Sequence, residues 1–176
     1  NTLETVARLP DDGRPQLLIT GRAADLDDEA ARRLGTRLLH LPDLVADVDP
    51  LRDAAAALAL ARTIDRAVDR IGSPVVVHTH SSKAGVVGRL AARAIRGVIV
   101  VHTIHGFGID ALGARRRSLL EAAERVSGRA CDVAVFVSDA DRAHAEQRAL
   151  FPCARRVVIR SGIDPRPFAA LRDDGE

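Results

Sequence analysis

Residues 75–108 read VVVHTHSSKAGVVGRLAARAIRGVIVVHTIHGFG and contain two short apolar runs separated by a helical segment. The runs at 75–79 and 98–103 are rich in β-branched residues, which is typical of parallel strands that are buried on both faces. Residues 84–96 between them have helical character and end at Gly97. The stretch therefore predicts a strand, a helix and a second strand of one parallel sheet.

The same alternation continues outward in both directions along the chain. Further segments are predicted from their apolar periodicity: strands at 16–20, 36–41, 132–137 and 156–160, and helices at 2–9, 51–71, 112–130 and 139–149. Asp49-Pro50 marks the start of the long helix, and Gly72 with Pro74 marks its end. We expect an α/β doubly wound, Rossmann-like fold with three αβα layers. One domain is expected over residues 1–164, with residues 165–176 as a linker or a cut tail.

The composition excludes several classes of protein. Aromatic residues make up 2% of the 176 residues, with four Phe and no Trp or Tyr, so the chain lacks the platforms on which single-stranded bases stack. The formal net charge is +2, with Arg and acidic residues interspersed, and we expect a solvated mixed surface and no nucleic-acid partner. Cys131 and Cys153 fit a reduced cytoplasmic protein without a disulfide. No run of about 18 apolar residues predicts a transmembrane helix.

Polar residues gather where the predicted strands end. The four clusters are 78–83 (HTHSSK), 102–108 (HTIHGFG), 138–139 (SD) and 161–164 (SGID). In open α/β sheets, ligands bind beyond the carboxyl ends of the strands. We therefore expect these clusters to meet at one rim, with His80 and His105 facing the same hollow.

Individual residues at this rim have distinct predicted roles. Ser81 and Ser82 are placed to cap the helix that follows, where backbone N–H groups favour an anion or a hydroxyl. Lys83 is the only lysine in the chain, and its ammonium can bind phosphates or hydroxyls. His105 precedes a loop with Gly106 that lets backbone approach a ligand.

For other polar residues near the rim, the sequence predicts structural roles. His78 and His102 are expected just inside the strands, in supporting positions. Ser138 is predicted to cap the helix that starts at Asp139.

At these residues the sequence resembles the family 4 glycosyltransferases of the GT-B fold. The resemblance rests on the block at 75–108, in which His78-Thr79-His80-Ser81-Ser82-Lys83-Ala84-Gly85 is followed by His102-Thr103-Ile104-His105-Gly106. Segments 135–142 (VFVSDADR) and 157–164 (VVIRSGID) resemble later parts of the same domain. The resemblance covers nearly the whole chain.

The resemblance implies an enzyme with two Rossmann-like domains that face a cleft. Such enzymes transfer a sugar from a nucleotide-sugar donor to a glycan or lipid-linked acceptor, retain the anomeric configuration, and use no cofactor and usually no metal. This chain is similar to the N-terminal, acceptor-side domain. Bacterial polysaccharide, cell-wall or glycolipid assembly is typical of the family, in the cytoplasm or at the inner face of the membrane with peripheral contact.

The resemblance also implies site residues by position. His105 is expected to contact the transferred sugar or the reacting centre as the catalytic residue, and Gly162 is expected near the donor phosphates. The remaining expected substrate-binding residues lie on the acceptor side or near the cleft: His80, Ser81, Ser82, Lys83, Gly106 and Ser138.

The sequence also departs from the family pattern. The first strand with its Gly-rich loop and the C-terminal donor domain do not fall within residues 1–176, so we expect the chain alone to be inactive. Ser161 stands where Asn is commoner. Because the absent first strand is central in this fold, either residues 16–20 pair directly with 75–79 or that side is poorly ordered.

Two other functions remain open at this point. His78-x-His80 with His102 and His105 has the chemistry of a metal site, which suggests a metal-dependent hydrolase. However, side chains at 78 and 80 share a face only while the strand continues, and no acidic ligand lies at either strand end. The third hypothesis is a non-catalytic carbohydrate- or nucleotide-binding domain.

Overall fold

A computed structural model of the protein describes residues 2–9, 13–21, 27–72, 74–107 and 113–162. The strands are β1 (Leu18–Thr20), β2 (Leu38–His40), β3 (Val75–His80), β4 (Val98–Ile104), β5 (Val133–Phe136) and β6 (Arg155–Val158). The helices are α1 (Thr2–Arg8), α2 (Asp27–Leu34), α3 (Pro50–Ile71), α4 (Ser82–Arg93), α5 (Ala114–Gly128) and α6 (Asp139–Gln147), with a short 3₁₀ turn at Gly35–Arg37. The linker or cut tail that the sequence predicts at residues 165–176 lies outside the described residues.

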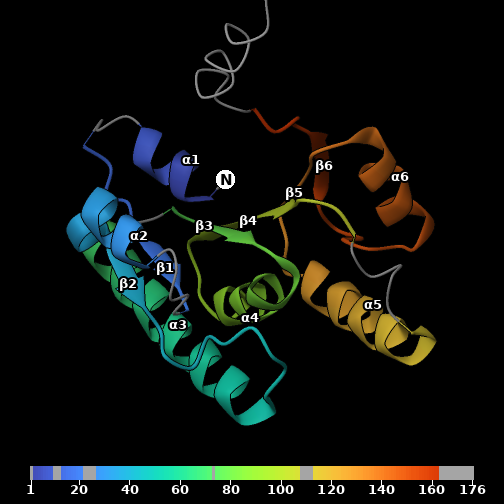
Figure 1. Ribbon diagram of the computed structural model, residues 1–176, viewed down its shortest axis with the longest axis horizontal. Coiled ribbons are helices and arrows are strands. Elements are labelled where there is room, and N and C mark those ends of the chain that lie inside the picture. Colours follow the sequence, from blue (N-terminus) through green and yellow to red (C-terminus); the bar gives the residue numbers. More distant parts are fainter. Residues whose placement is uncertain (1, 10–12, 22–26, 73, 108–112, 163–176) are drawn as a thin grey trace, which may run out of the picture.

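All paired strands are parallel, and they form two sheets. β1 pairs with β2, and the larger sheet has the order β3-β4-β5-β6. Below the strands in Figure 1 lie α3, α4 and α5, whereas α1 lies above them. This arrangement is the predicted α/β, Rossmann-like fold with helices on both sides of the strands.

The long helix α3 joins the two sheets into one body. Its N-terminus is capped by Asp49, whose carboxylate accepts hydrogen bonds from the backbone N–H groups of Leu51 and Arg52. It ends at Gly72, where φ is 81°, a value that favours glycine. Buried residues of α3 and α4 pack together, with Ile19 of β1 on one side and Val100 of β4 on the other. Both predicted helix boundaries are confirmed.

Helix α4 lies unusually close to the larger sheet because two glycines face it. A Cβ atom added at Gly88 would lie 2.8 Å from Cγ2 of Thr79, and one added at Gly85 would lie 2.5 Å from Cε1 of His102. These contacts fix the height of the helix above β3 and β4. They also place the start of α4 directly beside the carboxyl ends of both strands.

Two sequence-based expectations about the sheet are corrected. Direct pairing of β1 with β3 does not occur in the described ranges, where the two sheets share no strand pairing. Burial of β3 on both faces was also wrong, since Val76 is 59% exposed and Ile99 of β4 is 39% exposed. The physical reason is that α4 covers only one face of these strands, so the alternate side chains point into the open face.

Candidate functional site

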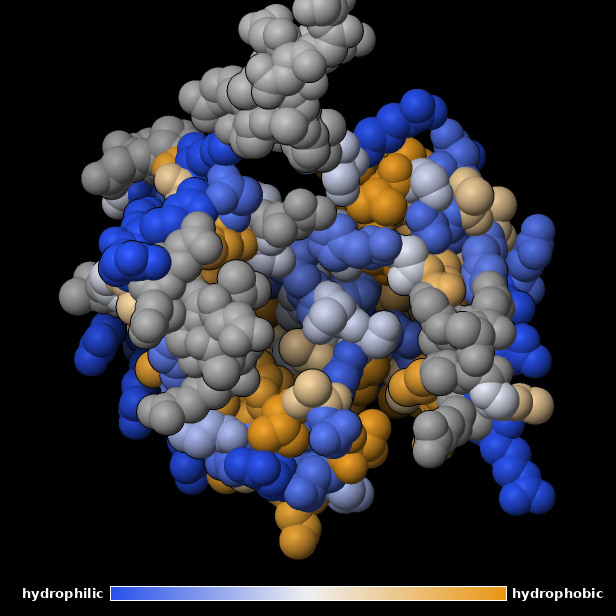
Figure 2. Space-filling view, viewed as in Figure 1, coloured by the Kyte–Doolittle hydropathy of each residue, from blue (hydrophilic) through white to orange (hydrophobic). Residues whose placement is uncertain are grey.

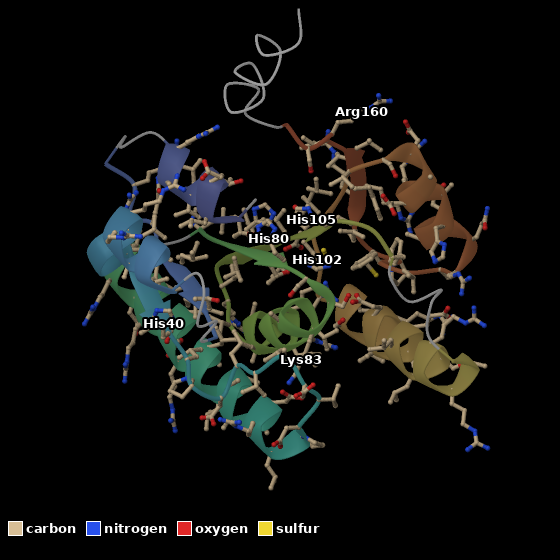
Figure 3. The ribbon with its side chains drawn as sticks, in the orientation of Figure 1. His40, His80, Lys83, His102, His105 and Arg160 are labelled. Carbon is tan, nitrogen blue, oxygen red and sulfur yellow. The ribbon has the colours of Figure 1, made fainter. Side chains whose placement is uncertain are left out.

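His80 and His105 meet at the carboxyl ends of neighbouring strands. His80 is the last residue of β3, and His105 directly follows β4. The parallel register pairs His80 with Thr103, which brings the two imidazoles together. His80 Nδ1 and His105 Nε2 are 3.1 Å apart, and their ring centroids are 5.4 Å apart. Figure 3 shows both side chains over the middle of the sheet, so the two imidazoles converge as expected, although of the two only His105 lines the cavity described below.

His78 extends this pair along the open face of the sheet. Its ring centroid lies 4.3 Å from that of His80, and its Nε2 lies 2.7 Å from Oγ1 of Thr103. Burial lowers the pKa of His80 to about 4, and the charges of His78 and His105 add to this effect. Burial likewise lowers the pKa of His78. His78 and His80 are therefore neutral at neutral pH and can accept hydrogen bonds from hydroxyl groups.

His102 has the structural role that the sequence predicts. It lies on the opposite face of β4, where it is 2% exposed. Its Nδ1 is 2.9 Å from Oγ1 of Thr79, and its ring stacks on Phe151 at 5.5 Å between centroids. Burial lowers the pKa of His102 to about 2, and the positive charge of Arg89 adds to this effect. His102 therefore stays neutral and supports the strand end from below.

A small cavity opens between the start of α4 and the loop after β4. Its volume is about 70 Å³. It is lined by Ser81, Ser82, His102, Thr103, Ile104, His105, Gly106, Phe107, Glu124 and Phe151. Four of the expected site residues therefore share one cavity. In Figure 2, hydrophilic residues gather over the region of β3 and β4, so this edge of the sheet presents a polar surface.

The start of α4 differs from the predicted cap. Ser81 occupies the N-cap position, but its side chain makes no capping hydrogen bond. Its φ of 59° and ψ of 158° belong to a region that residues other than glycine rarely adopt. This backbone geometry turns the chain sharply between β3 and α4. The prediction of a serine cap was wrong in its hydrogen bond, although both serines line the cavity.

Lys83 points away from the histidine row. Its ammonium lies 2.7 Å from Oδ1 of Asp53 in α3 and also donates to the backbone oxygen of Asp47. Figure 3 shows Lys83 well apart from His80 and His105. In this structure Lys83 ties α4 to the start of α3.

Ser138 and Gly162 lie outside the cavity lining. Ser138 caps α6, since its Oγ accepts a hydrogen bond from the backbone N–H of Asp141 at 3.1 Å. Gly162 follows β6, and a Cβ atom added there would meet nothing within 4 Å. Ser138 thus has the predicted capping role.

Sequence reasoning missed two charged residues beside the cavity. Glu124 of α5 lines it, and Arg89 of α4 pairs with Glu124 behind the wall. A signal was present, because Arg89 falls on the helix face that Gly85 and Ala92 define, four residues before it and three after it. A charge at such an apolar position is unusual unless it is paired.

The residues for the alternative metal site are only partly brought together. β3 continues through His80, so His78 and His80 do share a face. His102, however, points to the other face of β4. Within the ranges that the structure describes, no three His, Cys, Asp or Glu side chains form a group that could hold a metal ion. The geometry therefore does not favour a metal-dependent hydrolase.

Parallel strands, flanking helices and a polar cavity at the strand ends define a Rossmann-like domain, a fold class in which ligands bind at the carboxyl edge of the sheet. The sequence profile described as Glycosyltransferase Family 4 matches residues 2–166, and the chain belongs to this family. The resemblance seen in the sequence is thereby confirmed.

A relative from Escherichia coli is a UDP-Gal:alpha-D-GlcNAc-diphosphoundecaprenol alpha-1,3-galactosyltransferase. It is 26% identical over 141 residues, which cover 80% of this chain and 35% of that protein. The chain thus spans about a third of the length of this relative. Among the described residues, no helix is long and apolar enough to cross a membrane.

Proposed function

We propose that this chain is the acceptor-side domain of a retaining glycosyltransferase, which transfers a sugar from a nucleotide-sugar donor to a glycan or lipid-linked acceptor. Family membership and the galactosyltransferase relative support sugar transfer. The observation that carries the proposal is the pairing of His80 with His105 beside the polar cavity. The neutral imidazole of His80 and the serine hydroxyls suit the many hydroxyl groups of a sugar.

The histidine pair leaves two ring nitrogens for substrate. His80 Nδ1 and His105 Nε2 share one hydrogen bond, so one ring donates and the other accepts. For His105 Nδ1 and His80 Nε2, the described residues provide no partner. In the proposed reaction, His105 contacts the transferred sugar at the reacting centre, and His80 fixes the orientation and tautomer of His105.

The remaining proposed contacts surround this pair. Ser81, Ser82 and Gly106 bind the acceptor from the cavity side, and Ser138 lies near the cleft. Gly162 approaches the donor phosphates through its backbone. Lys83 takes part either by releasing Asp53 or by holding the start of α4 in place.

The proposal needs no cofactor, because the nucleotide-sugar is a co-substrate, and it includes no metal. The donor site itself is proposed to belong to a second, C-terminal domain, so that the chain alone does not turn over. A lipid-linked acceptor, as the name of the relative describes for that protein, would bring the enzyme to the membrane surface as a peripheral protein.

The direct test is a transfer assay on the full-length gene product. UDP-galactose and a GlcNAc-diphospholipid are the first substrates to use, followed by other nucleotide-sugars and acceptors. We expect His105→Ala to lower the transfer rate about 100-fold or more. The matched control is His40→Ala, at the end of β2, which should leave the rate within twofold.

Two results would contradict the proposal. An unchanged rate in His105→Ala would remove His105 from the reacting centre. Binding of sugars without transfer, for every donor and acceptor pair, would instead identify a non-catalytic carbohydrate-binding domain. Retention is checked by NMR of the anomeric proton in the first-formed product, and inversion would exclude the retaining class.

A further inference from the structure

The inner wall of the cavity carries a buried carboxylate. Glu124 is 6% exposed, and it lines the cavity opposite the start of α4. Its Oε2 accepts a hydrogen bond from Nη2 of Arg89. For Oε1, the described residues provide no hydrogen-bond partner. One oxygen of this carboxylate is therefore engaged by its counter-ion, and the other remains for a group that enters the cavity.

Arg89 is the fully buried partner of this carboxylate, with 0% exposure. Its Nη2 also donates to Oγ of Ser127 at 2.8 Å, and its guanidinium lies 5.2 Å from the centroid of the Phe151 ring. Its Nε and Nη1 are buried with no partner in the part of the chain that is described. Among the described residues, Arg89 therefore donates hydrogen bonds through Nη2 alone, although its whole guanidinium is buried.

Stability alone does not account for this ion pair. Removing two charges from water costs several kcal/mol per ion, and well-packed apolar residues of similar volume are often no less stable. The surroundings already include Phe136, Phe151 and Ala134, which form an apolar cluster. A charged pair kept at the wall of a cavity, beside His102 and His105, therefore indicates a ligand rather than a packing role.

The chemistry of the wall selects the ligand. Burial raises the pKa of Glu124, and the charge and hydrogen bond of Arg89 oppose this rise. The oxygens of the ionised carboxylate only accept hydrogen bonds, so they suit a hydroxyl group better than a phosphate. The volume of about 70 Å³ is smaller than the ~150 Å³ cavity that holds benzene. The cavity can therefore take one or two hydroxyl groups at the edge of a sugar ring, but neither a whole ring nor a diphosphate.

We propose that Glu124 binds a hydroxyl group of the acceptor sugar through Oε1, and that Arg89 is the positioning residue that keeps this carboxylate charged and oriented. This inference rests on the proposed sugar transfer and names the group that selects the acceptor. Ser81 and Ser82 complete the hydroxyl-binding wall from the opposite side. The diphosphate of a lipid-linked acceptor lies outside the cavity.

Binding is tested by NMR on the isotopically labelled chain. The probes are the methyl glycosides of N-acetylglucosamine, glucose, galactose and mannose, together with inorganic phosphate. At least one glycoside should shift the backbone amides of Ser81, Ser82 and Gly106, and phosphate should not displace it. Glu124→Gln should weaken this binding about 10-fold or more, because a hydrogen bond to a charged acceptor is lost.

Two further variants separate binding from folding. Glu121→Gln lies one turn earlier on α5, outside the cavity lining, and pairs with Arg125 and Arg148; it should bind as the parent chain does. The double variant Arg89→Met with Glu124→Leu removes both charges together, so it should fold while losing the binding. A folded double variant that binds glycosides normally would overturn the proposal, as would a panel in which no glycoside shifts the cavity residues.

Kinetics of the full-length gene product distinguish this inference from the proposed function. Glu124→Gln should raise the KM for the acceptor about 10-fold or more, while the KM for the donor and kcat stay within about threefold. If Glu124→Gln transferred sugar with an unchanged KM for the acceptor, the inference would be contradicted and the proposed function would stand. If glycoside binding depended on Glu124 but the protein never transferred sugar, the hydroxyl-binding role of Glu124 would stand and the proposed function would be contradicted.

Discussion

His102 is the buried imidazole whose protonation would cost the fold most. Its pKa is lowered to about 2 in the folded chain, against about 6.5 when it is unfolded. The unfolded chain therefore binds an extra proton below pH 6.5, and the folded state loses stability as the pH falls. From pH 6.5 down to about 4, we expect His102 alone to reduce the free energy of unfolding by about 1.4 kcal/mol per pH unit.

Urea denaturation at several pH values measures this slope. His102→Gln should have a slope that is smaller by about that amount, since the variant has no proton to gain at this position. A parent slope that His102→Gln leaves unchanged would show that other groups control the acid sensitivity.

At the residue scale, the sequence predicted that His80 and His105 come together at the strand ends. The convergence of His80 and His105 follows from parallel strands alone, because their carboxyl ends share an edge. The partnership of Arg89 with Glu124 could not be predicted in the same way. It depends on how α4 and α5 rotate against each other, which residues 35 positions apart in the sequence do not reveal.

Helix α4 has little freedom to move away from the sheet without losing contacts at its glycines. Gly85→Ala would place a methyl group 2.5 Å from Cε1 of the buried His102. Overpacking of this kind costs about 1–3 kcal/mol, and the helix propensity of alanine returns up to about 1 kcal/mol. We expect a net loss of about 1–2 kcal/mol in the free energy of unfolding.

The measurement is chemical denaturation, with Gly162→Ala as the matched control. At Gly162 the added methyl group meets nothing within 4 Å, so the same substitution should change the stability by less than about 0.5 kcal/mol. If Gly85→Ala proved as stable as the control, the close approach of α4 to β4 would be wrong.

At the scale of elements, most helices and strands followed from apolar periodicity and from Gly and Pro signals. α2 was missed because its sequence, DDEAARRL, is mostly charged. Its described buried side chains, Ala30 and Leu34, lie one turn apart on the same helix face, but the charged residues around them make this apolar stripe easy to overlook. Contacts with β2 and α1 therefore stabilise a helix that the local sequence pattern alone does not predict.

At the scale of the whole molecule, the order of the strands was predictable but the pairing was not. The sequence predicts a doubly wound parallel sheet, and the structure divides the described strands into two parallel groups. Direct pairing, one of the two expected outcomes, does not occur in the described residues, where both groups pack on α3 and α4. The Ala-rich helices contact both β1 and β3, which share no strand pairing in the part of the chain that the structure describes.

Because of this division, we expect the free energy of local opening to differ between the two sheets. β4 is hydrogen-bonded on both sides, whereas β1 and β2 are three residues long and, among the described residues, pair only with each other. We expect the backbone amides of β1 and β2 to exchange with deuterium about 100-fold faster than those of β4, because local openings need less free energy there. NMR-detected exchange measures this directly, and equal protection of the two sheets would contradict it.

The chain would then contain two cooperative units supported by one pair of helices. The smaller unit could melt and re-form many times while the four-stranded unit, with its row of imidazoles, remained intact. Mild heating should therefore remove the signals of residues 18–20 and 38–40 first, and the geometry around His105 should survive that loss.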